Sequence, residues 1–222
     1  MTRRPAIPVA ALLSAVALLA AIGVGPASAG TYSRDLYFRD GYERQIDSRT
    51  CTAASTAMMI NFIGRRDFDL DQSYILDWAQ DRDTLNDNTQ RGSDPLGWAR
   101  ALTWFGTRAG KGTIPYRWEA YSSEYIALKH AARVIAERGV PVGLLVRHGT
   151  HAVVMTGFEA TSDPRRGDFT LLSVWISDPN GSSHRRYTAS SSPLDTYLEL
   201  DAMYAYYDQA WYRRYVIVAP PI

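Results

Sequence analysis

Cys51 is the only cysteine in this chain, and the first 29 residues have the pattern of an export signal. Exported proteins normally pair their cysteines in disulfides, because the compartments outside the cytosol are oxidising. A lone cysteine forms no disulfide within the chain, so the fold has to be held together by a hydrophobic core. The thiol is then either an inert buried side chain or a group kept for chemistry.

Three features of the N-terminus predict export. Arg3 and Arg4 give a positive start, residues 9–24 form an almost uncharged apolar run, and residues 27–29 are Ala-Ser-Ala, a pattern that signal peptidase cleaves. The apolar run has 16 residues, whereas a membrane-spanning helix needs about 20. We therefore expect ordinary Sec export, cleavage after Ala29, and a secreted protein without a membrane anchor.

Residues 30–222 are enough for one domain with a sizeable core and few for two. Without Arg3 and Arg4 the chain carries 22 basic and 23 acidic residues, and its basic residues form no block or stripe. Nucleic acid and anionic membranes are therefore not expected as partners. The sequence does not reveal the oligomeric state, and a monomer is the default expectation.

The first half of the chain has helical patterns. The segment from Gly30 to Ser48 is polar and broken, and an alanine-rich stretch with Thr50 or Ser48 as a possible cap follows it. Apolar residues then recur at helical spacing, and glycines stand at the expected ends. Helices are predicted over residues 50–63, 68–80, 96–105 (after an Asp94-Pro95 opening) and 121–138.

The second half has strand patterns. Residues 140–147 and 151–158 are apolar runs separated by His148-Gly149-Thr150, which predicts an antiparallel hairpin. Strands are also predicted at 169–177 and 211–219, a turn at 178–181, a surface loop at 182–193 and a helix at 194–207. Helices followed by strands predict an α+β fold.

Thiol catalysis needs a thiolate, a base, a group that orients the base, and donors for the oxyanion. Cys51 opens a predicted helix, where the dipole and free N–H groups favour a thiolate. His151 opens a predicted strand, and Asp178 follows the next one. Gln45 lies six residues before Cys51 and offers a side-chain N–H. Order and placement together favour a catalytic site.

These residues resemble the papain-like cysteine peptidases. The matching segments are Gln45-Ile-Asp-Ser-Arg-Thr-Cys51, His151-Ala-Val-Val-Met-Thr-Gly157 and Ser177-Asp-Pro-Asn-Gly181, and they look closest to the bacteriocin-leader (double-glycine) peptidase branch. The resemblance implies a cysteine helix packed on an antiparallel sheet and a peptide or protein substrate. It also implies Cys51 as nucleophile, His151 as base, Asp178 as orienting group and Gln45 in the oxyanion hole.

Alternatives to hydrolysis stay open. Thr52 stands where the family usually has glycine, so a non-catalytic binding protein on the same fold is one alternative. Acyl transfer to an amine, as in transglutaminase-like enzymes, is another. Cell-wall endopeptidases of the NlpC type usually carry a second histidine where this chain has Asp178.

No cofactor or metal is expected. The other three histidines are scattered, with His130 on a predicted helix, His148 in the hairpin turn and His184 in a predicted polar loop. None of them takes part in a spacing typical of zinc sites.

Overall fold

The helix that begins at Cys51 lies at the centre of the fold. The structure, a computed structural model, describes residues 30–84, 92–147, 149–181, 183–189 and 214–222. Helix α1 (Cys51–Gly64) has 14 residues, of which every one up to Ile63 is buried. It ends where Arg65 takes a left-handed conformation with φ 52°. The predicted helix over residues 50–63 is therefore confirmed.

Three more helices follow in the described residues, and their caps set where they begin. They are α2 (Gln72–Gln80), α3 (Pro95–Phe105) and α4 (Glu124–Arg138). Helix α2 begins later than predicted because the Asp71 carboxylate accepts hydrogen bonds from the N–H groups of Ser73 and Tyr74. Helix α4 begins later because Tyr121 belongs to a strand.

The described strands form one antiparallel sheet of seven. They are β1 (Tyr32–Asp35), β2 (Arg117–Tyr121), β3 (Val142–Val146), β4 (His151–Ala160), β5 (Leu171–Asp178), β6 (Ser183–Thr188) and β7 (Tyr215–Ala219). Their order is β2-β7-β3-β4-β5-β6, and β1 pairs with β4. Short 3₁₀ turns occur at η1 (Arg39–Gly41), η2 (Gly106–Ala109) and η3 (Pro164–Arg166).

The strand predictions were right in part. The hairpin of β3 and β4 and the strand β5 are confirmed, and so is the described part of the final strand, β7. The surface loop predicted at 182–193 was wrong for its described part, since residues 183–188 form β6 and pair with β5 along their whole length. Strands β1 and β2 were not foreseen. The predicted signal peptide and the helix at 194–207 lie outside the described residues.

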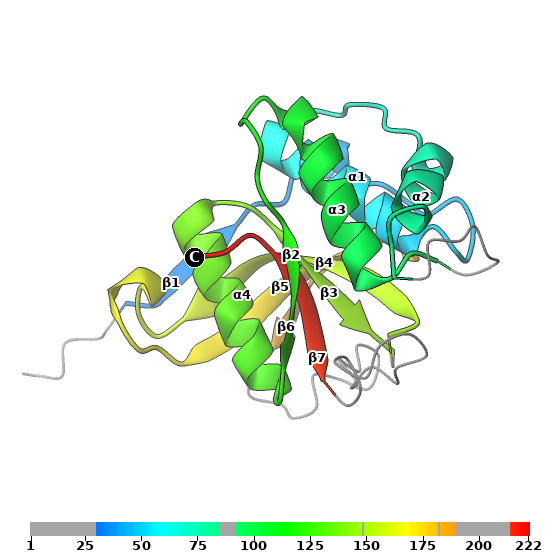
Figure 1. The fold of residues 1–222 in the computed structure, drawn as a ribbon. Coiled ribbons are helices and arrows are strands. Elements are labelled where there is room, and N and C mark those ends of the chain that lie inside the picture. The colour runs from blue at the N-terminus through cyan, green and yellow to red at the C-terminus, as the bar shows by residue number, and fades with distance from the viewer. Residues whose placement is uncertain (1–29, 85–91, 148, 182, 190–213) are drawn as a thin grey trace, which may run out of the picture.

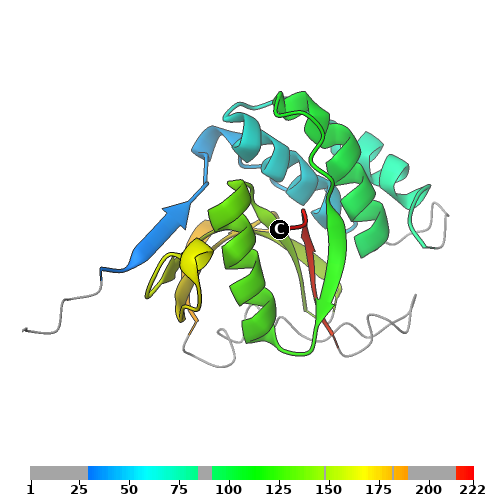
Figure 2. The same ribbon diagram turned by 60° about the vertical axis from the view of Figure 1, so that its left-hand side comes forward.

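Helices cover the sheet in two groups. Figure 1 and Figure 2 show α1, α2 and α3 gathered at one end of the molecule, while α4 lies against the sheet. The sheet and α3 pack closely at Gly143 of β3, where a Cβ would overlap the Trp98 ring of α3 and lie 2.6 Å from its Cζ2 atom. The predicted α+β arrangement, with the cysteine helix packed on an antiparallel sheet, is confirmed. No described helix is long and apolar enough to cross a bilayer.

Candidate active site

Cys51 is the first residue of α1 and is 6% exposed. Thr50 stands at the N-cap but makes no side-chain hydrogen bond to the first turn, although its carbonyl accepts from the Ala54 N–H at 2.8 Å. The first N–H groups of a helix have no partner within the helix, and they carry its positive dipole end. The Cys51 sulfur therefore sits where negative charge is stabilised.

His151 and Asp178 meet because they lie at the same end of two neighbouring antiparallel strands. Val154 of β4 is paired with Ser177 of β5, and extending this register by one residue places Asp178 opposite Val153. His151, two residues before Val153, is then the diagonal neighbour of Asp178 on the same face of the sheet. The Asp178 Oδ1 atom lies 2.7 Å from His151 Nε2.

The imidazole of His151 lies between the carboxylate and the thiol. Its Nε2 atom is bonded to Asp178, and the Cys51 side chain lies close enough to the ring to raise its pKa. Because a histidine ring has two nitrogens, Nδ1 is left for the thiol. The His151 and Asp178 side chains are only 7% and 13% exposed, so little water competes for these contacts.

The electrostatics of the pair favour an imidazolium beside a carboxylate. Burial by itself would lower the pKa of His151, but hydrogen bonds to Asp178 and Cys51, together with their charges, raise it to about 9. For Asp178, burial by itself would raise the pKa, because it also disfavours the charged form. Hydrogen bonds from His151 and from the Asn180 N–H outweigh it and hold that pKa below its usual value.

Gln45 lies beside the turn that follows Asp178. Its backbone N–H donates to the Pro179 carbonyl at 3.0 Å, and its side-chain Nε2 donates to the Asp47 carbonyl at 2.7 Å. An amide nitrogen carries two protons, so one donor is held within the loop and the other is left for a ligand. The Gln45 Oε1 atom is buried without a hydrogen-bond partner. Its place in an oxyanion hole remains a prediction.

The loop between Gln45 and Cys51 is fixed by its own polar side chains. Asp47 Oδ1 accepts from the N–H groups of Arg49 and Thr50, at 2.8 and 3.1 Å. Thr50 Oγ1 in turn accepts from the N–H groups of Ile46 and Asp47, both at 3.1 Å. These hydrogen bonds favour one conformation of the loop before Cys51, which suits a preorganised site.

Tyr42 is a site residue that the sequence did not reveal. Its hydroxyl contacts the carbonyl oxygens of both Asp178, at 2.6 Å, and Gly181, so it holds the turn that carries the carboxylate. Burial, followed by the charge of Asp178, raises the pKa of Tyr42 to about 12, so the hydroxyl keeps its proton. A separation of 136 residues between Tyr42 and Asp178 gives no local signal of this contact.

Of the remaining histidines, His130 and His184 make their contacts with other residues than Cys51. His130 of α4 lies 3.4 Å from Glu119, and His148 is outside the described residues. The prediction of His184 in a polar loop was wrong, since it belongs to β6. Within the described ranges, no three His, Cys, Asp or Glu side chains gather as a metal site would require.

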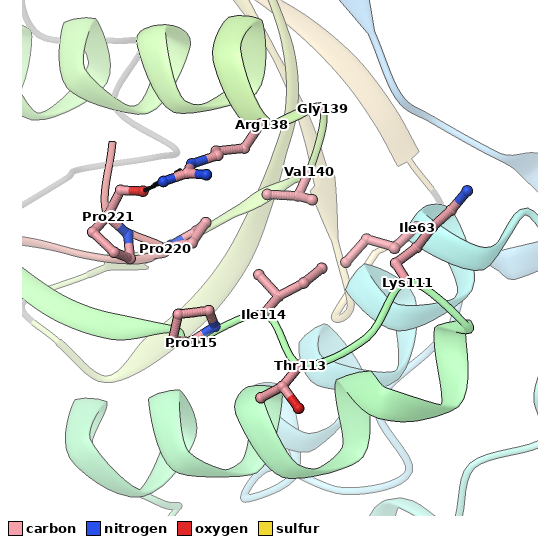
Figure 3. A pocket seen from close by; sticks show the side chains of 10 residues that line it. All are labelled: Ile63, Lys111, Thr113, Ile114, Pro115, Arg138, Gly139, Val140, Pro220 and Pro221. Atoms are coloured by element: carbon pink, nitrogen blue, oxygen red, sulfur yellow. Dashed lines mark hydrogen bonds between the residues drawn. The ribbon is translucent and has the colours of Figure 1, made fainter.

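The cavity drawn in Figure 3 is separate from these residues. It has a volume of about 480 Å³ and lies between the ends of α1 and α4, residues 111–115 and the C-terminal prolines. Ile63, Ile114 and Val140 line it, and Arg138 donates two hydrogen bonds to the Pro221 carbonyl, at 2.9 and 2.7 Å. Neither Cys51 nor its partners line this cavity, so it says nothing of the reaction.

Comparison with known proteins supports the resemblance found in the sequence. A search of curated proteins gives no match. The model of the Peptidase_C39 like family matches residues 41–210, a span that contains the cysteine helix and the strands of His151 and Asp178. This match covers most of the chain, and the chain therefore belongs to the Peptidase_C39 like family.

Proposed function

We propose that this protein is a secreted cysteine peptidase that hydrolyses a peptide bond through a thioacyl-enzyme at Cys51. The observation that carries the proposal is the position of His151, whose imidazole is bonded to Asp178 at 2.7 Å and whose pKa is raised by the nearby Cys51 side chain. Such a chain of thiol, imidazole and carboxylate is the arrangement that nucleophilic thiol catalysis requires. Membership of the family supports the same chemistry.

In the first half of the reaction His151 holds the proton of the Cys51 thiol. The thiolate attacks the carbonyl carbon of the substrate, and the carbonyl π-electrons move to its oxygen. The N–H of Cys51 and the second N–H of the Gln45 amide are the donors proposed for that oxyanion. When the C–N bond breaks, the Nδ1 proton of His151 goes to the leaving amine, and a thioester remains on Cys51.

In the second half water replaces the amine. Neutral His151 accepts a proton from the water as its oxygen attacks the thioester carbon, and the C–S bond then breaks. The carboxylic acid product leaves, and the thiolate–imidazolium pair is restored. Asp178 stays ionised throughout and keeps the ring oriented with Nδ1 toward the sulfur.

Secretion is part of the proposal and is supported by the N-terminal sequence. The predicted cleavage after Ala29 would remove a segment that precedes the first described strand, which begins at Tyr32. Cleavage there would leave β1 paired with β4. A signal-peptide test is direct: N-terminal sequencing of the protein recovered from the medium should start at Gly30.

Thiol reactivity tests the active site. An ion-paired thiolate exists at mildly acidic pH in far larger amount than the thiolate of free cysteine, although its lower basicity makes it less nucleophilic. We expect iodoacetamide at pH 5.5 to alkylate Cys51 about tenfold faster than free cysteine. His151→Ala should remove this advantage, and His130→Ala, a change outside the site, should keep it.

The outcome also separates the proposal from its alternatives. Alkylation of Cys51 no faster than that of free cysteine would refute the catalytic site and favour a non-catalytic binding protein. Fast alkylation of Cys51 could also be followed by transfer of the acyl group to an added primary amine in place of water. Release of the resulting amide would identify an acyltransferase. Mass spectrometry of the products distinguishes the acid from the amide.

A further inference from the structure

A second histidine–aspartate pair lies next to the strand that carries Asp178. His184 Nε2 is 2.8 Å from Asp35 Oδ2, and His184 Nδ1 is 3.3 Å from the hydroxyl of Ser177. The Tyr37 ring stacks on the His184 imidazole with 4.0 Å between centroids and 8° between planes. The Thr156 hydroxyl donates to Asp35 Oδ1 at 2.8 Å. We call these five residues the His184 cluster.

The His184 cluster touches each element that carries a residue of the active site. Ser177 immediately precedes Asp178 on β5 and is fully buried. Thr156 is the extra residue of a β-bulge in β4, the strand that His151 opens. Tyr37 packs edge-on against Phe62 of α1, the helix that Cys51 opens, with 5.6 Å between ring centroids.

We propose that His184 is a positioning residue for the active site, which holds Ser177 and thereby aims Asp178 at His151. Successive residues of a strand point to opposite faces, so fixing the Ser177 side chain fixes the direction of its neighbour. Through Asp35, the N-terminal strand β1 becomes part of the catalytic framework and is not a removable propeptide. This inference rests on the proposed function, whose site it completes.

The cluster keeps its hydrogen bonds in either charge state of His184. Burial by itself would raise the pKa of Asp35, but hydrogen bonds from His184, Thr156 and the Tyr37 N–H hold it below its usual value. The carboxylate therefore stays ionised and accepts from Nε2–H. A serine hydroxyl both donates and accepts, so Ser177 donates to Nδ1 of the neutral ring and accepts from the cation.

The pKa of His151 is the readout that separates positioning from stability alone. His184→Phe keeps a ring against Tyr37 and loses both hydrogen bonds. Asp35→Asn removes the charge and replaces one of the two accepting oxygens by an N–H donor. NMR titration of the His151 imidazole should give a lower pKa in both variants than in the unaltered protein. Alkylation of Cys51 at pH 5.5 should slow by about tenfold in His184→Phe, as coupled contacts of one network allow. Arg185→Gln, at the exposed neighbour on β6, should change neither quantity.

Two results would overturn the proposal. One is a His151 pKa equal to that of the unaltered protein in His184→Phe and Asp35→Asn, even if their melting temperatures fall. The other applies if these variants do not fold. It is an unchanged His151 pKa in Ser177→Ala, which removes one hydroxyl and should shift that pKa in the same direction. A protein that cleaves no peptide but shows these shifts would refute the proposed function and leave the positioning role intact.

Discussion

Asp178→Asn is the change that most directly tests how the site works. The substitution keeps the size of the side chain and removes the charge that faces His151 Nε2 at 2.7 Å. Burial, which by itself lowers the pKa of His151, is then opposed mainly by the contact with Cys51. We expect the pKa of His151 to fall well below its value of about 9 in the unaltered protein.

The size of the effect follows from the shift itself. Raising the pKa of a histidine from 6.5 to about 9 corresponds to about 3 kcal/mol of stabilisation of the imidazolium. Because the folded-state pKa is the higher one, this stability is fully present below about pH 6.5 and is lost as pH rises through about 9. Asp178→Asn should remove a large part of it.

Two measurements check this expectation. NMR titration of the imidazole Cε1–H signal gives the pKa of His151, and urea unfolding at pH 6.5 and 9.5 gives the free energy of unfolding. The unfolding series keeps Cys51 in both proteins, because its interaction with His151 is part of the pKa shift. Asp168→Asn, which removes the same charge where the side chain is 90% exposed, is the control. An unchanged His151 pKa in Asp178→Asn would refute the assignment of Asp178 as the orienting group.

Two further predictions concern Gln45 and the core. Gln45→Ala should slow hydrolysis of a peptide substrate by about a hundredfold, as loss of one oxyanion donor does elsewhere. Alkylation of Cys51 should stay nearly unchanged in this variant. Equal slowing of both reactions would show that Gln45 acts on the thiol instead. Gly143→Ala should destabilise the protein by about 1–3 kcal/mol in urea unfolding, because its Cβ would overlap the Trp98 ring. Its control, Gly106→Ala, meets no atom within 4 Å and should leave stability equal or slightly raised.

The predicted elements differ in how local their signals are. Helix α3 was predicted well because Asp94 and Pro95 mark its start in the sequence itself, and the Asp94 carboxylate does accept from the Gly97 N–H at 2.9 Å. Strand β6 was missed because its sequence, Ser-His-Arg-Arg-Tyr-Thr, has no apolar alternation. It is a strand because β5 pairs with it, which is a tertiary effect that propensity does not contain.

The site residues divide in the same way. Cys51, His151 and Asp178 stand at element ends that the sequence marks, so their neighbourhood could be predicted once the strands were placed. Tyr42 and His184 could not be found, because each acts through contacts across more than a hundred residues, to Asp178 and Asp35 respectively. Their own segments look like ordinary polar loop in the sequence.

Strand register is what turns these scattered residues into one site. Asp178 faces His151 only while Val154 stays opposite Ser177, since a slip of one residue would turn Asp178 to the other face of the sheet. The bulge at Thr156 separates this stretch from the differently phased pairing beyond Gly157. Thr156 is also the bulge residue whose hydroxyl is bonded to Asp35. The hydrogen bond between Thr156 and Asp35 therefore joins the bulge in β4 to β1. Through it the N-terminal strand is linked to the geometry around Cys51.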